Sequence, residues 1–406
     1  MKSKKIVFVF GLIFAWLILA NGVVADTITD DPEKDLALNK DLKAAKTELQ
    51  SGKQFLRDSR INWEKNRDAY FQDGSEANLA NAKKYAKQLI NQSIDLLDQY
   101  YDLLTVEINN LSGIEVSDKN SMISDLKNEK AWLQTQRVAI TESNDALKIT
   151  GVADTLDAYL QNKQPLFYRI IGIIAASRVN KTITINTDAL DRFEAGLGIL
   201  TDLNRTVGTP QNLFNQLSDQ VAQAKEKYTA ALNGFRSLNS VTTAQTDFES
   251  ERSSLNQSRD LLTEAQTSRQ NLITELKKIK GSKIGGSGEL AAQGNGSFVI
   301  SNNGSVSLKA DGEVTLQLYD WAGDAEVTTT GNASIESADK KTTYRGFTEA
   351  TITGKEYLIL VKGSVTELSA EGGGRAFLSG TGTYQIEGGT AQSFEGANGV
   401  IFTISS

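Results

Sequence analysis

Apolar side chains recur at helical spacing between residues 30 and 280. Two sets fall seven residues apart, namely Leu126, Leu133, Ile140 and Leu147, and Phe248, Leu255 and Leu262. A third set steps by four and three residues along 213–235. Each set lies along one face of a helix and needs a neighbouring helix to cover it. We therefore predict a helical bundle in this part of the chain.

Prolines and turn residues mark the ends of these helices. Asp31-Pro32 and Thr209-Pro210 each place a capping side chain before a proline, and proline is favoured at the first helical position. Turn clusters stand at 73–75, 113–117, 150–151 and 240–243. We predict helices near 32–71, 75–112, 117–148, 152–205, 209–238 and 243–280, arranged as an elongated antiparallel bundle or coiled coil over residues 26–280.

The most apolar stretch outside the N-terminus is PLFYRIIGIIAASRV, residues 165–179. A membrane span needs about 20 apolar residues. The uninterrupted run here is only seven residues long and lies between Arg169 and Arg178. We therefore expect this helix to be buried in the bundle, with Gly172 admitting a close neighbour and Pro165 kinking the helix one turn earlier. We expect the two arginines to reach outward to water.

The first 25 residues have the parts of a secretion signal. Lys2, Lys4 and Lys5 precede an apolar run over 6–20, and small residues at 23–25 are typical of a cleavage site. We predict a signal peptide at 1–25 and a mature chain that starts at Asp26. The alternative is an uncleaved anchor, which would be the chain's one contact with a membrane. Both alternatives place the rest of the chain outside the cytoplasm.

The composition changes to Gly, Ser, Thr and Val after residue 280. The composition of residues 281–293 predicts a Gly/Ser-rich linker. Beyond it, short segments alternate in polarity, and glycines recur at a spacing of eight residues, as at 296, 304 and 312. Asn303-Gly304 and Asp311-Gly312 favour tight hairpins, so we expect one strand and one turn per period. We predict an antiparallel β-sandwich or barrel over 294–406, rather than a parallel β-helix, and hence an α+β chain with separate domains.

Charge and missing residue types exclude several functions. The net charge is -7, and residues 286–406 hold 7 Lys and Arg against 14 Asp and Glu, so nucleic acid is a poor partner. The chain has no Cys and no His, and therefore lacks disulfides, thiolate chemistry and the commonest general base and metal ligand. No residues stand out as a catalytic, metal or cofactor site. We predict that the protein is not an enzyme and uses no cofactor.

The segment YDWAGDAE at 319–326 is the most site-like part of the sequence. It brings together Tyr319, Asp320, Trp321 and Asp324, and aromatic residues beside acids can bind sugar rings or Ca²⁺. The alternative is a bulged strand end whose tryptophan closes the core.

Eight sequons for N-linked glycosylation are present, at Asn91, Asn110, Asn180, Asn204, Asn256, Asn295, Asn303 and Asn332. Asn303 and Asn332 fall on predicted hairpin turns. We expect these two to be the accessible acceptors if the protein is glycosylated.

The order of four segments resembles an uncharacterised group of exported helical surface proteins of archaea and candidate-phylum bacteria. The segments are LLDQYYDLLTVEI, DLKNEKAWLQTQRVAI, RIIGIIAASRV and AKEKYTAAL, and the resemblance covers roughly residues 75–280. It implies a helical architecture and no established activity.

These features predict an exported structural or interaction protein of the cell surface or envelope, in which the helices carry a β module. Its partners would be envelope or surface proteins, glycans, or further copies of the chain. One alternative is a carbohydrate- or calcium-binding module. A less favoured one is an exported hydrolase that works through paired carboxylates.

Overall fold

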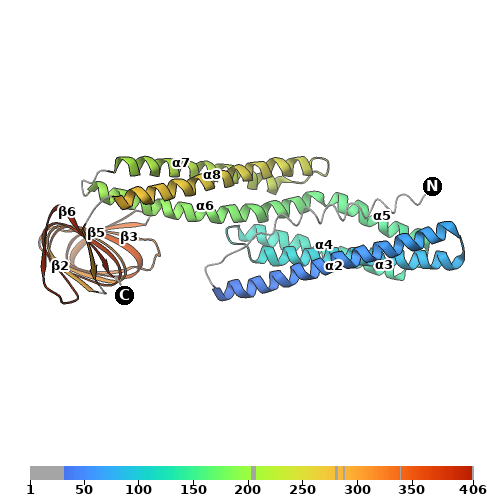
Figure 1. The fold of residues 1–406 in the computed structure, drawn as a ribbon, viewed down its shortest axis with the longest axis horizontal. Helices are drawn as coiled ribbons and strands as arrows, with labels where there is room; N and C mark the ends of the chain where they lie inside the picture. The colour runs from blue at the N-terminus through green and yellow to red at the C-terminus, as the bar shows by residue number, and fades with distance from the viewer. Residues whose placement is uncertain (1–31, 203–206, 279–281, 287–288, 339, 405–406) are drawn as a thin grey trace. The chain divides into compact units, whose positions relative to one another are not determined.

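The computed structural model describes residues 32–202, 207–278, 282–286, 289–338 and 340–404 (Figure 1). The predicted signal peptide, the cleavage point and Asn204 lie outside the described residues. The chain forms helices followed by a largely antiparallel sheet, which confirms the predicted α+β layout. Contacts divide it into two compact units, residues 1–187 with 219–265, and residues 188–218 with 266–406.

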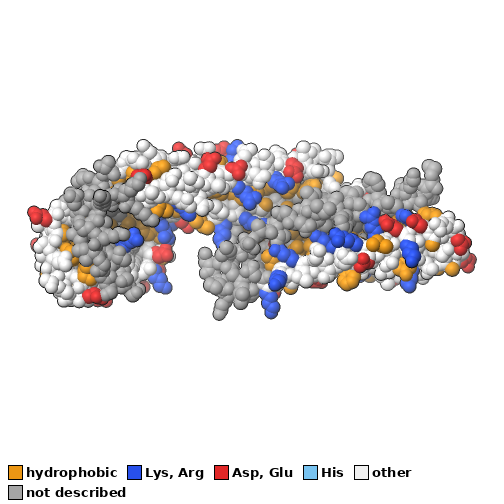
Figure 2. All heavy atoms as spheres, viewed as in Figure 1, with side chains coloured by type: hydrophobic (Ala, Val, Ile, Leu, Met, Phe, Trp, Pro, Cys, Tyr) orange, Lys and Arg blue, Asp and Glu red, His pale blue; other side chains and the backbone are white. Residues whose placement is uncertain are grey.

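The described part of the chain contains seven helices. They are α2 (Pro32–Gln72), α3 (Glu76–Asn109), α4 (Val116–Glu142), α5 (Ala146–Asn162), α6 (Gln164–Asp202), α7 (Gly208–Ser237) and α8 (Ala244–Lys278). Helices α6, α7 and α8 each contribute residues to both compact units. Figure 2 shows acidic and basic side chains interspersed along the visible faces of the helices.

Two of the predicted helices, 117–148 and 152–205, have the wrong boundaries. The break expected at Thr150-Gly151 lies inside α5, and the actual break precedes Asp145, whose carboxylate accepts a hydrogen bond from Leu147 N at 3.0 Å and caps α5. A further break falls at Lys163. Pro165 is the second residue of α6, so it stands at a junction between two helices rather than causing a kink inside one, because proline lacks the N–H that a continuous helix would use.

The break before Asp145 also decides which heptad residues are buried. Leu126, Leu133 and Ile140 are each fully buried on α4, whereas Leu147 on α5 is 73% exposed. The chain changes direction between α4 and α5, so the seven-residue phase does not continue across the break. The prediction is confirmed for the first three residues and wrong for Leu147.

The apolar stretch at 165–179 is buried among helices, as predicted, and none of the described helices could cross a membrane. Its fully buried isoleucines are Ile170 and Ile174. Arg169 reaches the surface, where it forms a 2.7 Å ion pair with Asp125. Arg178 is only half-exposed, and burial lowers the pKa of its guanidinium while the charge of Glu107 raises it. Both arginines are thus half-buried, and the expectation of outward-reaching side chains holds only in part for each.

The strands are β1 (Ser282–Gly286), β2 (Glu289–Ala310), β3 (Thr315–Asp320), β4 (Glu326–Ala338), β5 (Lys341–Ile386) and β6 (Gln392–Ile404). The order in the sheet is β1-β6-β5-β2, and β3 and β4 also pair with β5. Strand β1 runs parallel to β6, and β2, β4 and β6 run antiparallel to β5. Strand β1 and the start of β2 fall in the segment predicted as a linker. Its described residues are extended because they pair with distant strands, which a Gly/Ser composition does not reveal.

Strand β5 winds around β2. Phe298 of β2 lies opposite Val361 on one side and Leu378 on the other. Strand β5 has 46 residues. A straight strand of that many residues would extend about 150 Å, at about 3.3 Å per residue. Strand β5 therefore turns back on itself to pair with both edges of β2. Residues from several strands, including Phe298 of β2, Leu316 of β3 and Ile352 of β5, share a large buried apolar core. A smaller cluster surrounds Leu360.

The repeated glycines mark close approaches of neighbouring strands rather than a hairpin turn in each period. Gly304 lies inside β2 with φ +151°, opposite Gly372 of β5. A Cβ at position 304 would stand 2.2 Å from the carbonyl oxygen of Glu371, so only glycine fits there. Gly312 does occupy a turn, between β2 and β3, with φ +86°. The strands on either side of this turn, β2 and β3, each pair with β5, and the described ladders include none between the two. The turn at Asp311-Gly312 is therefore confirmed, but the hairpin prediction is wrong both there and at Asn303-Gly304.

Candidate functional site

The segment singled out in the sequence forms the loop between β3 and β4. Tyr319 and Asp320 end β3, and Trp321 follows directly. The rings of Tyr319 and Trp321 stack with centroids 6.1 Å apart and planes 17° apart. Both side chains are half-buried. A pair of half-buried aromatic rings therefore stands where β3 ends and the loop begins.

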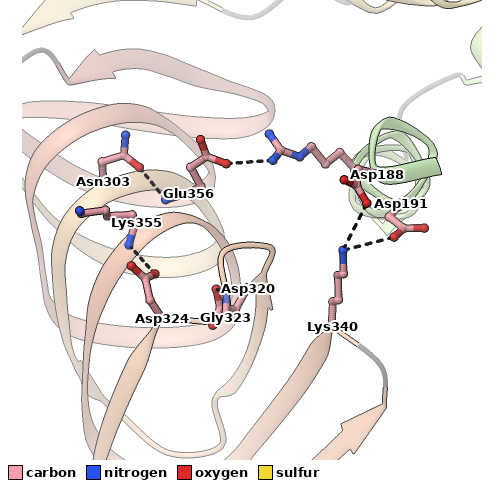
Figure 3. A network of polar contacts seen from close by, with 10 residues as sticks. Asp188, Asp191, Asn303, Asp320, Gly323, Asp324, Lys340, Lys355 and Glu356 are labelled. Atoms are coloured by element: carbon pink, nitrogen blue, oxygen red, sulfur yellow. Dashed lines mark hydrogen bonds and ion pairs between the residues drawn. The ribbon is translucent and has the colours of Figure 1, made fainter. Parts of the chain in front are cut away.

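The two acids of this loop hold backbone N–H groups (Figure 3). Asp320 accepts hydrogen bonds from Gly323 N at 2.8 Å and from Ala325 N at 2.9 Å, one on each carboxylate oxygen. Asp324 accepts one from Lys355 N at 3.0 Å. Both oxygens of Asp320 thus shape the loop itself, and one oxygen of Asp324 joins the loop to β5. In the described ranges, no three acidic side chains come together as a set that could hold a metal ion.

We call the sheet formed by β1 to β6 the β module. Three residues of α6, Asp188, Asp191 and Arg192, lie against it (Figure 3). Arg192 Nη2 forms a 2.8 Å ion pair with Glu356 Oε2, and its guanidinium carbon lies 5.7 Å from the centre of the Trp321 ring. Lys340 Nζ lies 3.9 Å from Asp188 Oδ1 and 3.5 Å from Asp191 Oδ2. Residues three and four apart share one face of a helix. We call these six residues the α6–loop contact. Three come from α6, Trp321 and Lys340 come from loops, and Glu356 lies within β5.

Asn303 forms a hydrogen bond with the backbone of Glu356, one of the residues in this contact. The backbone of Glu356 has φ +51°, a left-handed conformation that is uncommon for a residue with a side chain. Its N–H donates a 2.6 Å hydrogen bond to Asn303 Oδ1. Asn303, which the sequence marked as a glycan acceptor, thereby fixes the residue that pairs with Arg192.

The α6–loop contact is polar and open to solvent. The side chains of Arg192 and Glu356 are 51% and 56% exposed, and exposed ion pairs contribute about 0–1 kcal/mol each. A cation over an aromatic ring at an exposed site adds about 0.5–1 kcal/mol. Salt screens such pairs. The contact can therefore hold the loops to α6 and release them when the ionic strength rises.

A second polar site lies among α2, α3 and α4, in a groove of about 590 Å³. It is lined by Glu48, Gly52, Phe55, Gln92, Asp95, Asp98, Gln99, Asp102, Gln134 and Arg137. Ion pairs occupy several of its charges, including Arg137 with Asp95 at 2.5 Å and Lys130 with Asp102 at 2.6 Å. Burial lowers the pKa of Lys130, but its bonds to Asp102 more than offset this and raise the pKa.

The groove was not predicted from the sequence. The spacing of Asp95, Asp98 and Asp102 by three and four residues is the signal for an acidic helix face, but it does not reveal which helices face it. Its amide and carboxylate oxygens can accept hydrogen bonds from a polar ligand.

No known protein family matches this chain, and neither a curated protein nor a solved structure matches it. The resemblance to exported helical surface proteins therefore stays a prediction.

Proposed function

We propose that this is an exported structural or interaction protein of the cell surface or envelope, whose helices carry the β module. The observation that supports it best is the position of Arg192. This one side chain of α6 contacts both Trp321 and Glu356 of the β module. The β module is therefore connected to α6 by side-chain contacts as well as by the covalent chain.

Export is proposed from the leader-like sequence at 1–25, with its three lysines, apolar run and small residues. Envelope proteins, glycans or further copies of this chain are the partners that fit such a location. Light scattering on the mature protein tests the self-association.

For the β module we also propose the narrower fold of a sandwich or barrel. Its support is the pairing of β2 with β5 along both edges and the large apolar core to which β2, β3, β5 and β6 contribute.

The second candidate is carbohydrate binding through the stacked rings of Tyr319 and Trp321. The ring pair favours it, because sugar rings pack on aromatic faces. Arg192 lies over the same tryptophan, so a sugar would have to displace it. If this candidate holds, Trp321→Ala abolishes signals on a glycan array and Asp324→Ala weakens them by disordering the loop. Equal signals for all three proteins would remove it, and a calcium titration tests the metal alternative in the same variants.

Fractionation of host cells with mass spectrometry of the protein's N-terminus tests the export proposal. We expect a chain that starts at Asp26 in the envelope or the medium. A membrane fraction with an intact leader would indicate the anchored form. A chain retaining its leader in the cytoplasm would contradict the proposal.

A further inference from the structure

The seven sequons within the described residues differ in whether their asparagine can be reached by an enzyme. Transfer of a glycan needs an exposed amide and a stretch of backbone that can lie in the enzyme's active site. Position i+2, the hydroxyl residue of the sequon, must be presented together with the asparagine. In a strand these two positions share one face, whereas in a helix they point apart.

The helical sequons fail these requirements. The amide of Asn110 donates a 2.6 Å hydrogen bond to Val106 O, and that of Asn180 donates a 2.7 Å bond to Gly113 O. Asn91 is half-buried on α3. Asn256 is exposed, but it stands in the middle of α8, where Ser258 is fully buried and donates a hydrogen bond to Ala224 O.

Two sequons on β2 are also constrained. Asn295 pairs with Ser364 on one side and with Thr381 on the other, so its backbone has no free edge. Asn303 accepts the N–H of Glu356, as described above.

Asn332 is placed differently. Its side chain and that of Ser334 are both exposed on β4. Strand β4 pairs with β5, and no other described strand covers its second edge. Within β4, Gly331 lies opposite Phe347 and Ser334 opposite Arg345.

The register therefore leaves Asn332 and Ala333 facing the single residue Gly346, which is a β-bulge. Gly331 and Gly346 both adopt left-handed conformations, with φ +90° and φ +75°. The bulge interrupts the regular pairing at the sequon and leaves its backbone open along the free edge.

We propose that Asn332 is a site of N-linked glycosylation. In the transfer, Asn332 Nδ2 forms a bond to C1 of a lipid-pyrophosphate-linked oligosaccharide. The bond between C1 and the pyrophosphate oxygen breaks, Nδ2 gives up one proton, and the lipid pyrophosphate leaves. A glycan here would cover the free edge of β4, which otherwise offers unpaired backbone groups to another strand. In the cell the modification depends on the proposed export.

The test uses the purified, folded mature chain. It is incubated with a single-subunit oligosaccharyltransferase of Asn-x-Ser/Thr specificity and its lipid-linked oligosaccharide, and glycopeptides are mapped by mass spectrometry. The urea-unfolded chain serves as the control for sequence competence. We expect glycan at Asn332 in the folded chain and at several sequons in the unfolded one. Asn332→Gln and Ser334→Ala should each remove the modification of the folded chain, whereas Asn256→Gln should leave it unchanged.

An unmodified Asn332 in a folded chain whose unfolded form is modified there would overturn the proposal. So would equal occupancy at Asn256 or Asn295 in the folded chain. Because the enzyme and donor are supplied, this experiment does not depend on export. A cytoplasmic location in the host would contradict the proposed function and leave the accessibility of Asn332 standing.

Discussion

Gly172 of α6 lies directly against the ring of Phe235 of α7. A Cβ at position 172 would stand 2.2 Å from Phe235 Cδ1 and 2.4 Å from Cγ. Both residues lie in the same compact unit, and Phe235 is only 1% exposed. The glycine in the apolar stretch 165–179 is therefore a point where α6 and α7 pack closely around a buried ring.

Gly172→Ala should destabilise the protein by about 1–3 kcal/mol, because the added methyl group must displace a buried ring. Gly151→Ala is the matched control, since α5 has open space around that glycine. Alanine favours a helix over glycine by about 1 kcal/mol, so Gly151→Ala should leave stability unchanged or raise it. Urea unfolding measures both. Equal losses of unfolding free energy in the two variants would show that the contact with Phe235 does not affect stability. Adding Phe235→Leu to Gly172→Ala should recover part of the lost stability.

Leu133 and Leu147 occupy equivalent positions in the sequence repeat and opposite environments in the fold. Leu133 is fully buried and Leu147 is 73% exposed. Leu133→Ala should cost about 2–5 kcal/mol through lost burial and the cavity left behind, and Leu147→Ala should change stability by less than about 0.5 kcal/mol. Thermal or urea unfolding distinguishes them. A large loss in Leu147→Ala would mean that the heptad does continue through 143–145.

Glu107 should make stability fall as the pH rises. Burial raises the pKa of its carboxyl above the ordinary value of 4.5, although the charges of Arg178 and Lys46 act in the opposite direction. The folded state then binds this proton more tightly than the unfolded state. Stability from this group is complete below pH 4.5 and decreases above it, up to the folded-state pKa.

Glu107→Gln removes this titration. The wild-type protein should therefore lose unfolding free energy relative to the variant between pH 4.5 and neutral pH. Urea unfolding across this range measures the difference, with exposed Glu142→Gln as the control. Parallel pH profiles for wild type and Glu107→Gln would contradict the raised pKa.

Local sequence patterns predicted the helices but not the contacts that join distant segments. The spacing of Leu126, Leu133 and Ile140 correctly marked a buried face because helical neighbours are three to four residues apart. The sequence analysis did not predict the break before Asp145. Aspartate is common in polar segments, and its presence alone does not show that it caps a helix. Asn303-Gly304 has the composition of a hairpin, yet its geometry is set by a partner strand far along the chain.

The candidate site shows the same division. The aromatic and acidic loop at 319–326 could be found from its composition alone. Arg192, which lies over Trp321, could not, because its ion-pair partner Glu356 is 164 residues away in the sequence. No periodicity links an exposed arginine on a helix to a distant residue of β5.

Hydrogen–deuterium exchange on the chain from Asp26 onward and on its Arg192→Ala variant most directly tests the central claim that α6 holds the β module through Arg192. Arg345→Ala is the matched control, because Arg345 forms its ion pair with Glu336 inside the β module. Arg192→Ala should speed exchange in peptides covering 319–325 and 355–357 at low salt, while peptides of the β2 core stay protected. The difference should shrink at high salt, where the wild-type contact is itself screened. Unchanged exchange in both of those peptides in Arg192→Ala would contradict the account.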